Sequence, residues 1–256
     1  MDNVKLIAEF FLISLSLSYT AYSPIANSQL TGNGFIRLIS NLSIGSLVVA
    51  LIINLVSGGH ISSTENILKL VSIISLVLNT LFHKDIKSIF MWILYAVITS
   101  ALTYHILLIA KFNITHFAFL IGSTALLGII TYAMTLGHWY LVVPKLSERP
   151  LVIAALVTWF VLFIKVVISS QAIMQNLEFF NENTMLGSGY AFNMMLLLMR
   201  TLFGYIVILG MSIFNWKLVK MRSIQSSTGV LYAMTFFIFV GELISNYIFF
   251  NYGLLI

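Results

Sequence analysis

Hydrophobic and polar positions alternate along this chain in long blocks. Eight apolar segments are separated by short polar stretches, and they cover approximately residues 4–22, 35–57, 66–82, 86–109, 112–136, 150–170, 190–214 and 228–250. A helix rises about 1.5 Å per residue, so about 20 residues cross a hydrocarbon core of about 30 Å. Backbone groups in lipid must be hydrogen-bonded within their own segment, which favours helices. The pattern predicts an all-α, polytopic transmembrane helical bundle of about eight spans.

The composition supports this interpretation and indicates that most of the protein surface faces lipid. The chain is 60% hydrophobic and only 8% charged, with a mean hydropathy of +1.02. A soluble domain carries about 25% charged residues, so most of this surface must face a lipid bilayer. We expect one integral-membrane domain over residues 1–256. Residues 1–24 lack a clear Ala-x-Ala cleavage site, so we expect a retained first helix rather than a cleaved signal peptide.

The basic residues predict an orientation. The net charge is +5, but the lysines and arginines lie between apolar runs, which indicates membrane topology and not nucleic-acid binding. The loops after segments one, three, five and seven carry eight of them: Arg37, Lys84, Lys87, Lys145, Arg149, Lys217, Lys220 and Arg222. The other side carries three: Lys5, Lys69 and Lys111. We therefore expect both termini outside the cytoplasm, with a bacterial inner membrane as the location.

The chain also shows a possible repeat of helix pairs. The stretch "MTLGHWYLV" from Met134 resembles "MSIFNWKLV" from Met211, and the alignment places His138 opposite Asn215. Both stretches end odd-numbered segments. A bundle built from repeated helix hairpins would explain the likeness. Chance recurrence of Leu, Val and Trp in apolar helices is the alternative.

Ionisable residues inside the spans are the main candidates for function. A charge at the bilayer centre costs on the order of 2.5–3.5 kcal/mol on insertion scales, so such residues usually have a role. Arg200 and Glu242 lie on consecutive antiparallel segments, at similar depths of about 12–15 Å below the outer boundary. We predict contact between them, either as a structural ion pair or as a proton or ligand site.

Further polar residues form a second group of candidates. Glu9, His105, His116 and Lys165 lie near the outer ends of their segments, and we expect Lys165 to extend to the interface. His105 and His116 lie on the two arms of one hairpin, which suits a haem, a metal or a proton relay, or simply hydrogen-bonded structure. The remaining candidates are His138, Tyr232 and Gln225, and Gln225 lies beside Ser226 and Ser227, which are expected to cap the last helix.

The sequence excludes several kinds of chemistry and leaves three functions open. The absence of cysteine excludes disulfides, Cys-ligated zinc, iron–sulfur clusters and thiol catalysis. No metal-binding or phosphate-binding motif is present, so we expect no metal site and no stand-alone enzyme. We favour a subunit of a larger membrane complex, working with other subunits or as a homo-oligomer, in redox or ion translocation with a quinone or haem. The alternatives are a small-solute or ion transporter with its site near Arg200 and Glu242, and an intramembrane enzyme acting on lipid.

The predicted orientation is open to a direct test, because the natural chain contains no cysteine. A cysteine introduced at Asn181 should react with a membrane-impermeant thiol reagent added to intact cells, because we place that loop outside. A cysteine at Ser223 should react only after the membrane is opened. The reverse pattern of labelling would show that the termini lie in the cytoplasm.

Overall fold

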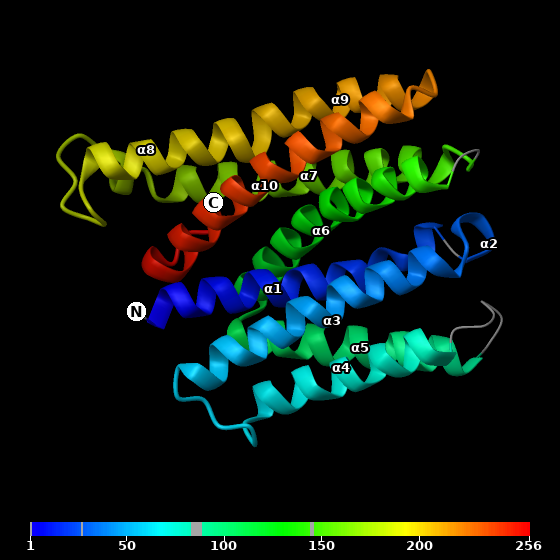
Figure 1. Cartoon of the computed structure of the whole chain (residues 1–256). Coiled ribbons are helices and arrows are strands. Elements are labelled where there is room, and N and C mark those ends of the chain that lie inside the picture. Colours follow the sequence, from blue (N-terminus) through cyan, green and yellow to red (C-terminus); the bar gives the residue numbers. More distant parts are fainter. Residues whose placement is uncertain (1, 27, 83–88, 144–145) are drawn as a thin grey trace.

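The structure confirms the predicted fold class. This computed structural model describes residues 2–26, 28–82, 89–143 and 146–256, apart from the side chains of residues 2, 28 and 29. Within those ranges the chain is helical and contains no strand (Figure 1). Eight helices are long and apolar enough to cross a membrane. The protein is therefore an all-α, multi-pass membrane protein.

Each predicted segment corresponds to one observed span. The spans are α1 (Asp2–Tyr22, followed by the 3-10 turn η1, Ser23–Ala26), α3 (Asn33–Val56), α4 (Thr64–Phe82), α5 (Ile89–Ile109), α6 (Ile114–Val142), α7 (Arg149–Gln175), the continuous run of α8 (Tyr190–Thr201), η3 (Leu202–Ile206) and α9 (Val207–Lys220), and α10 (Ile224–Tyr252). Two short helices lie between spans: α2 (Ser28–Thr31) and η2 (Leu177–Phe180). The predicted orientation charges Lys84, Lys87 and Lys145 lie outside the described residues.

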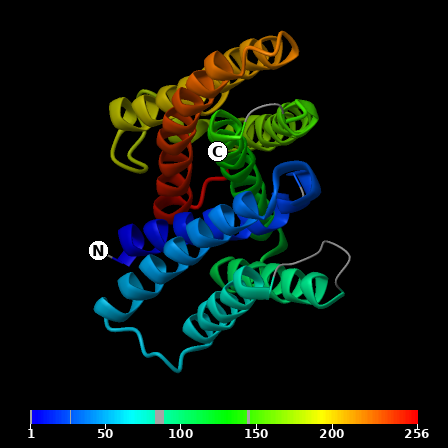
Figure 2. The same ribbon diagram turned by 45° about the vertical axis from the view of Figure 1, so that its right-hand side comes forward.

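The spans form two four-helix bundles. In the first bundle, α1, α3, α4 and α5 pack in order, and α5 returns to α1. In the second bundle, α6 packs on α7, α7 on α9, and α9 on α10, which returns to α6. Short connections between antiparallel neighbours are typical of up-and-down bundles. Figures 1 and 2 show the first bundle below and the second above, with α1, α6 and α10 at their junction.

Small residues and hydroxyl groups bring the two bundles together. A Cβ atom at Gly128 on α6 would lie 1.9 Å from the Cβ of Ser18 on α1, so only glycine allows this crossing. Ser18 donates a hydrogen bond to the carbonyl oxygen of Thr124 at 2.8 Å, and Ser14 Oγ lies 2.9 Å from Thr124 Oγ1. Close backbone approach and interhelical hydrogen bonds stabilise helix pairs in lipid, where hydrophobic driving force between helices is absent.

A tight turn between α5 and α6 joins the two bundles along the chain. Lys111 and Phe112 have φ angles of 52° and 58°, the left-handed region that non-glycine residues rarely adopt. The side chain of Asn113 then caps α6, because its Oδ1 accepts from the backbone N–H groups of Thr115 at 2.9 Å and His116 at 3.1 Å. The cap begins α6 immediately after the turn.

The end of the molecule where α1 begins and α10 ends is called the terminal face. The α3–α4, α5–α6 and α7–α8 connections lie at the same end (Figure 1, left). The ends of α4, α6 and α9 and the starts of α5, α7 and α10 lie at the opposite face. The depth of a buried side chain is therefore its distance from the terminal face, at about 1.5 Å per residue along its own helix.

The crossing at Gly128 generates a stability prediction. Gly128→Ala should destabilise the protein by about 1–3 kcal/mol, because the added methyl group overlaps Ser18 and forces α1 and α6 apart. Thermal unfolding in detergent, followed by size-exclusion chromatography with fluorescence detection, measures the effect. Gly45→Ala on α3 is the matched control, because nothing lies within 4 Å of its added Cβ. Equal stability of the two variants would contradict close packing at Gly128.

Candidate functional site

An ion pair occupies the interior of the second bundle. Arg200 lies at the end of α8 and Glu242 on α10, and both side chains are fully buried at 0% exposure. Arg200 Nη1 donates to Glu242 Oε1 at 2.9 Å. Each residue lies about 15 Å from the terminal face, counted along its helix. The two side chains therefore meet at the same depth, as helices of opposite direction allow.

Local backbone geometry makes room for the guanidinium group. The chain forms a π-helical turn, η3, directly after Arg200, and Gly204 lies within it. A Cβ at Gly204 would lie 2.6 Å from Arg200 Nη1, and a Cβ at Gly241 on α10 would lie 2.6 Å from the Cα of Gly204. Single π-helical turns are frequent at functional sites. The two glycines allow α10 to approach closely enough for Glu242 to reach Arg200.

Two hydroxyl groups extend the pair towards α7. Arg200 Nη2 donates to the hydroxyl oxygen of Tyr205 at 2.9 Å, and the Arg200 guanidinium carbon lies 4.3 Å from the centre of the Tyr205 ring. The Tyr205 hydroxyl lies 2.5 Å from Ser169 Oγ on α7. One hydrogen-bonded network therefore links Glu242, Arg200, Tyr205 and Ser169 across three spans.

Lys165 adds a second buried cation. Its side chain is fully buried, donates to Ser123 Oγ on α6 at 2.7 Å, and lies 3.8 Å from the centre of the Phe119 ring. The expectation that Lys165 extends to the interface is therefore wrong: the ammonium group turns into the bundle. Among the described residues, no carboxylate lies within 4.0 Å of it. We call Lys165, Arg200 and Glu242 the charged core of the second bundle.

Several buried polar atoms around the charged core have no hydrogen-bond partner within the described part of the chain. They are Glu242 Oε2, Arg200 Nε, and both amide atoms of Asn246, one helical turn after Glu242. A buried polar group without a partner is costly and calls for an explanation. The charged core thus has capacity for further hydrogen bonds beyond those that hold its own helices together.

A second cluster of buried charge lies in the first bundle. Glu9 on α1 forms an ion pair with Lys69 on α4, and both are buried. Asn54 Nδ2 on α3 lies 3.2 Å from each carboxylate oxygen of Glu9, and Lys69 also donates to Asn66 Oδ1 at 3.0 Å. His105 Nε2 lies 3.9 Å from Glu9 Oε1. This cluster lies closer to the terminal face than the charged core of the second bundle.

Lys69 is a second lysine whose position differs from the sequence-based expectation. The count of basic residues places it among the outer loop charges, but its side chain is fully buried in the first bundle, where it contacts Glu9 and Asn66. The signal was present in the polar spacing of this segment. The buried face of α4 consists of Asn66, Lys69, Ser72, Ser75, Leu76 and Asn79, at helical spacing in an otherwise apolar segment. A polar stripe of this kind predicts a helix that turns its polar side into a bundle.

The remaining predicted site residues fall in different places. His116 lies against Phe249 of α10, with ring centres 5.2 Å apart, so the two hairpin histidines have different neighbours. His138 and Tyr232 form an exposed pair, in which the Tyr232 hydroxyl lies 3.0 Å from His138 Nδ1. Gln225 is exposed in the first turn of α10.

The residues around Gln225 and His138 also correct two smaller expectations. Ser227 does not cap α10: it is buried and donates to Asn215 Oδ1 at 2.6 Å. His138 is exposed whereas Asn215 is buried, so the two aligned positions of the possible repeat have different surroundings. The likeness of the two stretches stays a prediction without support from these side chains.

A cleft of about 620 Å³ opens at the opposite face, between the α6–α7 and α9–α10 connections. Glu148, Arg149 and Arg222 are among its lining residues, and Arg222 lies 3.3 Å from Glu148 as an ion pair. The pKa of Glu148 lies below its ordinary value, because its own backbone N–H hydrogen-bonds the carboxylate and Arg222 lies beside it. Glu148 and Arg222 are accessible to solvent and already paired with each other, which makes the cleft a weaker candidate than the buried clusters.

No protein-family model, curated protein or solved structure matches this chain. The functional argument therefore depends on the geometry of the buried clusters.

The Arg200–Glu242 pair generates a coupling prediction. Arg200→Ala should destabilise the protein by about 3–5 kcal/mol, because it leaves a buried carboxylate without its partner. The double variant Arg200→Ala/Glu242→Ala should lose less stability than this single variant. A double-mutant cycle of thermal unfolding in detergent measures the difference, and strictly additive effects would contradict energetic coupling between the two residues.

Proposed function

We propose that this chain translocates protons or a small ion across the membrane, and that the charged core of the second bundle is its working site. The observation that carries the proposal is the excess of buried charge. Two cations, Lys165 and Arg200, share one four-helix bundle with one anion, Glu242, and all three are fully buried. Holding the helices together needs only one cation. Ionisable residues within membrane spans mark ion pathways and proton relays.

The hydrogen bonds of the core support proton exchange at Glu242. Its Oε1 accepts from Arg200, while its Oε2 has no partner among the described residues. Protonation of the carboxylate weakens its hold on Arg200, and the Tyr205 hydroxyl keeps Arg200 Nη2 in place. The Tyr205 hydroxyl is in turn hydrogen-bonded to Ser169, so Arg200 stays anchored to this part of the bundle while Glu242 is neutral. Lys165 has no carboxylate partner among the described residues, so its buried ammonium group favours either the approach of an anion or the loss of a proton to give the neutral amine.

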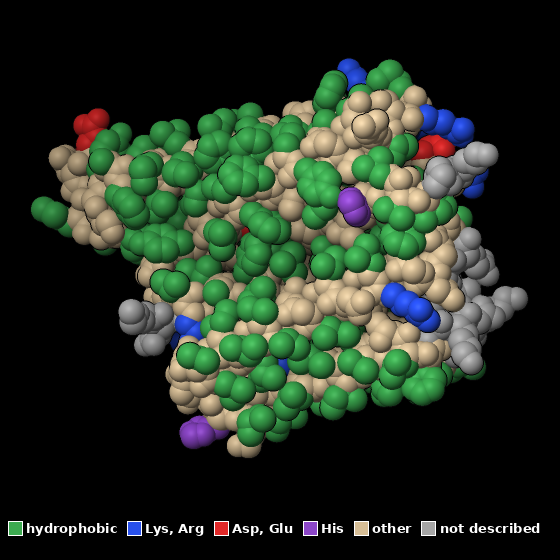
Figure 3. All heavy atoms as spheres, in the orientation of Figure 1, with side chains coloured by type: hydrophobic (Ala, Val, Ile, Leu, Met, Phe, Trp, Pro, Cys, Tyr) green, Lys and Arg blue, Asp and Glu red, His purple; other side chains and the backbone are tan. Residues whose placement is uncertain are grey.

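The proposal includes an orientation, with both termini outside and a bacterial inner membrane as the location. Figure 3 shows Lys and Arg side chains gathered at the right-hand end, which is the opposite face. Among the described residues, those exposed there are Arg37, Arg149, Lys217, Lys220 and Arg222, against an exposed Lys111 and a half-buried Lys5 at the terminal face. An excess of basic residues is typical of cytoplasmic loops. This orientation places the charged core in the outer half of the bilayer.

We propose that the chain works with other membrane subunits or as a homo-oligomer, and that a quinone is a better candidate cofactor than a haem. His105 and His116 have different neighbours, which does not favour one haem held by both. Purification from native membranes, with an absorption spectrum and analysis of co-purifying chains, tests both statements.

Reconstitution tests the central proposal. In liposomes with an internal pH-sensitive dye, the wild-type protein should dissipate an imposed proton gradient when a potassium diffusion potential compensates the charge. Glu242→Gln should reduce this flux to the level of protein-free liposomes. The amide keeps the shape of the side chain and a hydrogen bond to Arg200, but it does not take up and release a proton as a carboxylate does. Lys165→Met should also reduce the flux.

Glu178→Gln is the matched control, because this carboxylate is exposed in η2, far along the chain from the charged core. It should transport as the wild type does. A chloride-sensitive dye in parallel liposomes identifies an anion pathway. Wild-type flux in Glu242→Gln, for protons and for chloride, would refute the charged core as the working site.

A further inference from the structure

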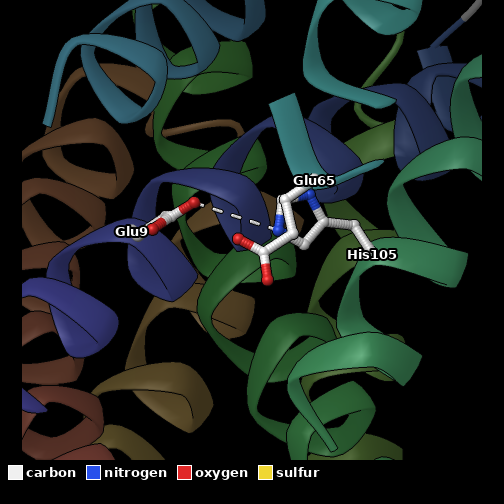
Figure 4. Close-up of side chains that lie close together, drawn as sticks. All are labelled: Glu9, Glu65 and His105. Carbon is white, nitrogen blue, oxygen red and sulfur yellow. Dashed lines mark ion pairs between the residues drawn. The ribbon is translucent and has the colours of Figure 1, made fainter. Parts of the chain in front are cut away.

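Three potential metal ligands from three helices converge in the first bundle. They are Glu9 on α1, Glu65 in the first turn of α4, and His105 about one turn before the end of α5 (Figure 4). One ligand atom from each lies within 4.8 Å of the others. Figure 4 shows the imidazole directed towards both carboxylates, and His105 Nε2 lies 3.9 Å from Glu9 Oε1. This cluster is separate from the charged core of the second bundle.

The imidazole of His105 has unused binding capacity. Its side chain is only 1% exposed, and its Nδ1 has no hydrogen-bond partner among the described residues. Its Nε2 lies 3.9 Å from Glu9 Oε1, which is too long for a hydrogen bond. Buried histidines usually satisfy both ring nitrogens, and neutral imidazole is the commonest metal ligand in proteins. A buried imidazole directed at two carboxylates is therefore suited to share a cation with them.

The charge balance of the cluster also favours a cation. Glu9 and Glu65 carry two negative charges against the single positive charge of Lys69. Glu65 is exposed near the terminal face, whereas Glu9 and His105 are buried behind it. A cation entering from the aqueous phase at the terminal face would meet Glu65 first and then reach the buried ligands. The cluster thus has both an attraction for a cation and a route of entry.

We propose that Glu9, Glu65 and His105 form a binding site for a divalent transition-metal ion of the zinc type. Zinc takes imidazole nitrogen and carboxylate oxygen at about 2.0–2.2 Å, which places tetrahedral ligands about 3.4 Å apart. The observed separations need only small side-chain adjustments to reach that value. Calcium and magnesium prefer six or more oxygen ligands, so a single imidazole with two carboxylates suits them less well.

Neighbouring residues supply the support that such a site needs. Asn54 Nδ2 lies 3.2 Å from both oxygens of Glu9 and orients its carboxylate. Lys69 donates to Glu9 Oε1, the oxygen that faces His105, so the ammonium group and a metal ion compete for it. Asn66 Oδ1, at 3.0 Å from Lys69 Nζ, keeps a bond to the ammonium group when the metal takes the carboxylate. The sequence contains no metal motif because the three ligands come from three separate helices.

Metal titration of the purified full-length protein tests the site. After treatment with a chelator in detergent, the wild type should bind one Zn²⁺ per chain by isothermal titration calorimetry. Co²⁺ should give visible absorption bands of nitrogen and oxygen coordination. His105→Gln should weaken Zn²⁺ binding by at least about tenfold and remove the bands. His116→Gln should bind as the wild type does, because that histidine lies against Phe249 instead.

The variant Lys69→Met distinguishes a metal site from a simple ion pair between Glu9 and Lys69. If the metal and Lys69 compete for Glu9, this variant should bind Zn²⁺ more tightly than the wild type, and Zn²⁺ should raise its unfolding temperature. Glu65→Gln gives a further variant that leaves the Glu9–Lys69 pair intact, and it should bind Zn²⁺ more weakly. Absence of wild-type binding at millimolar Zn²⁺, or equal binding by His105→Gln, would overturn the proposal. Glu242→Gln should leave Zn²⁺ binding unchanged, so this result is independent of the proposed translocation.

Discussion

The structure depends on the cost of placing a charge within lipid, which two ion pairs inside the protein offset. Removing a charged side chain from water is tolerated only when a partner and hydrogen bonds compensate it. In the first bundle Glu9 and Lys69 connect α1 with α4, and in the second bundle Arg200 and Glu242 connect α8 with α10. Each pair fixes the relative height of its two helices, because a shift by one turn would separate the charges by about 5 Å.

Close helix packing is the condition that allows these pairs to form. Gly204 and Gly241 let α10 approach the π-helical turn after Arg200, and Gly128 lets α6 approach α1 at Ser18. Larger side chains at Gly204 and Gly241 would keep α10 away from the π-helical turn and separate Glu242 from Arg200. The small residues therefore contribute to the electrostatics of the core through the distances they permit, although they carry no charge.

The sequence predicted the fold well and the sites only in part. Long apolar blocks identify spans reliably, and depth counting placed Arg200 beside Glu242 because consecutive helices are antiparallel neighbours. The same counting failed for Lys69, since one turn of helix decides whether a lysine near a span boundary is exposed or buried. The direction in which Lys165 extends depends on Ser123 and Phe119, which a pattern along one helix does not contain.

The two clusters differ in the sign of their excess charge. Glu9, Glu65 and Lys69 leave an excess of negative charge near the terminal face, whereas Lys165, Arg200 and Glu242 leave an excess of positive charge deeper in the second bundle. The negative excess in the first bundle would attract a cation, and the positive excess in the second bundle would attract an anion. The two clusters are joined by one helix contact, because α1 carries Glu9 and packs on α6, which holds Ser123 beside Lys165.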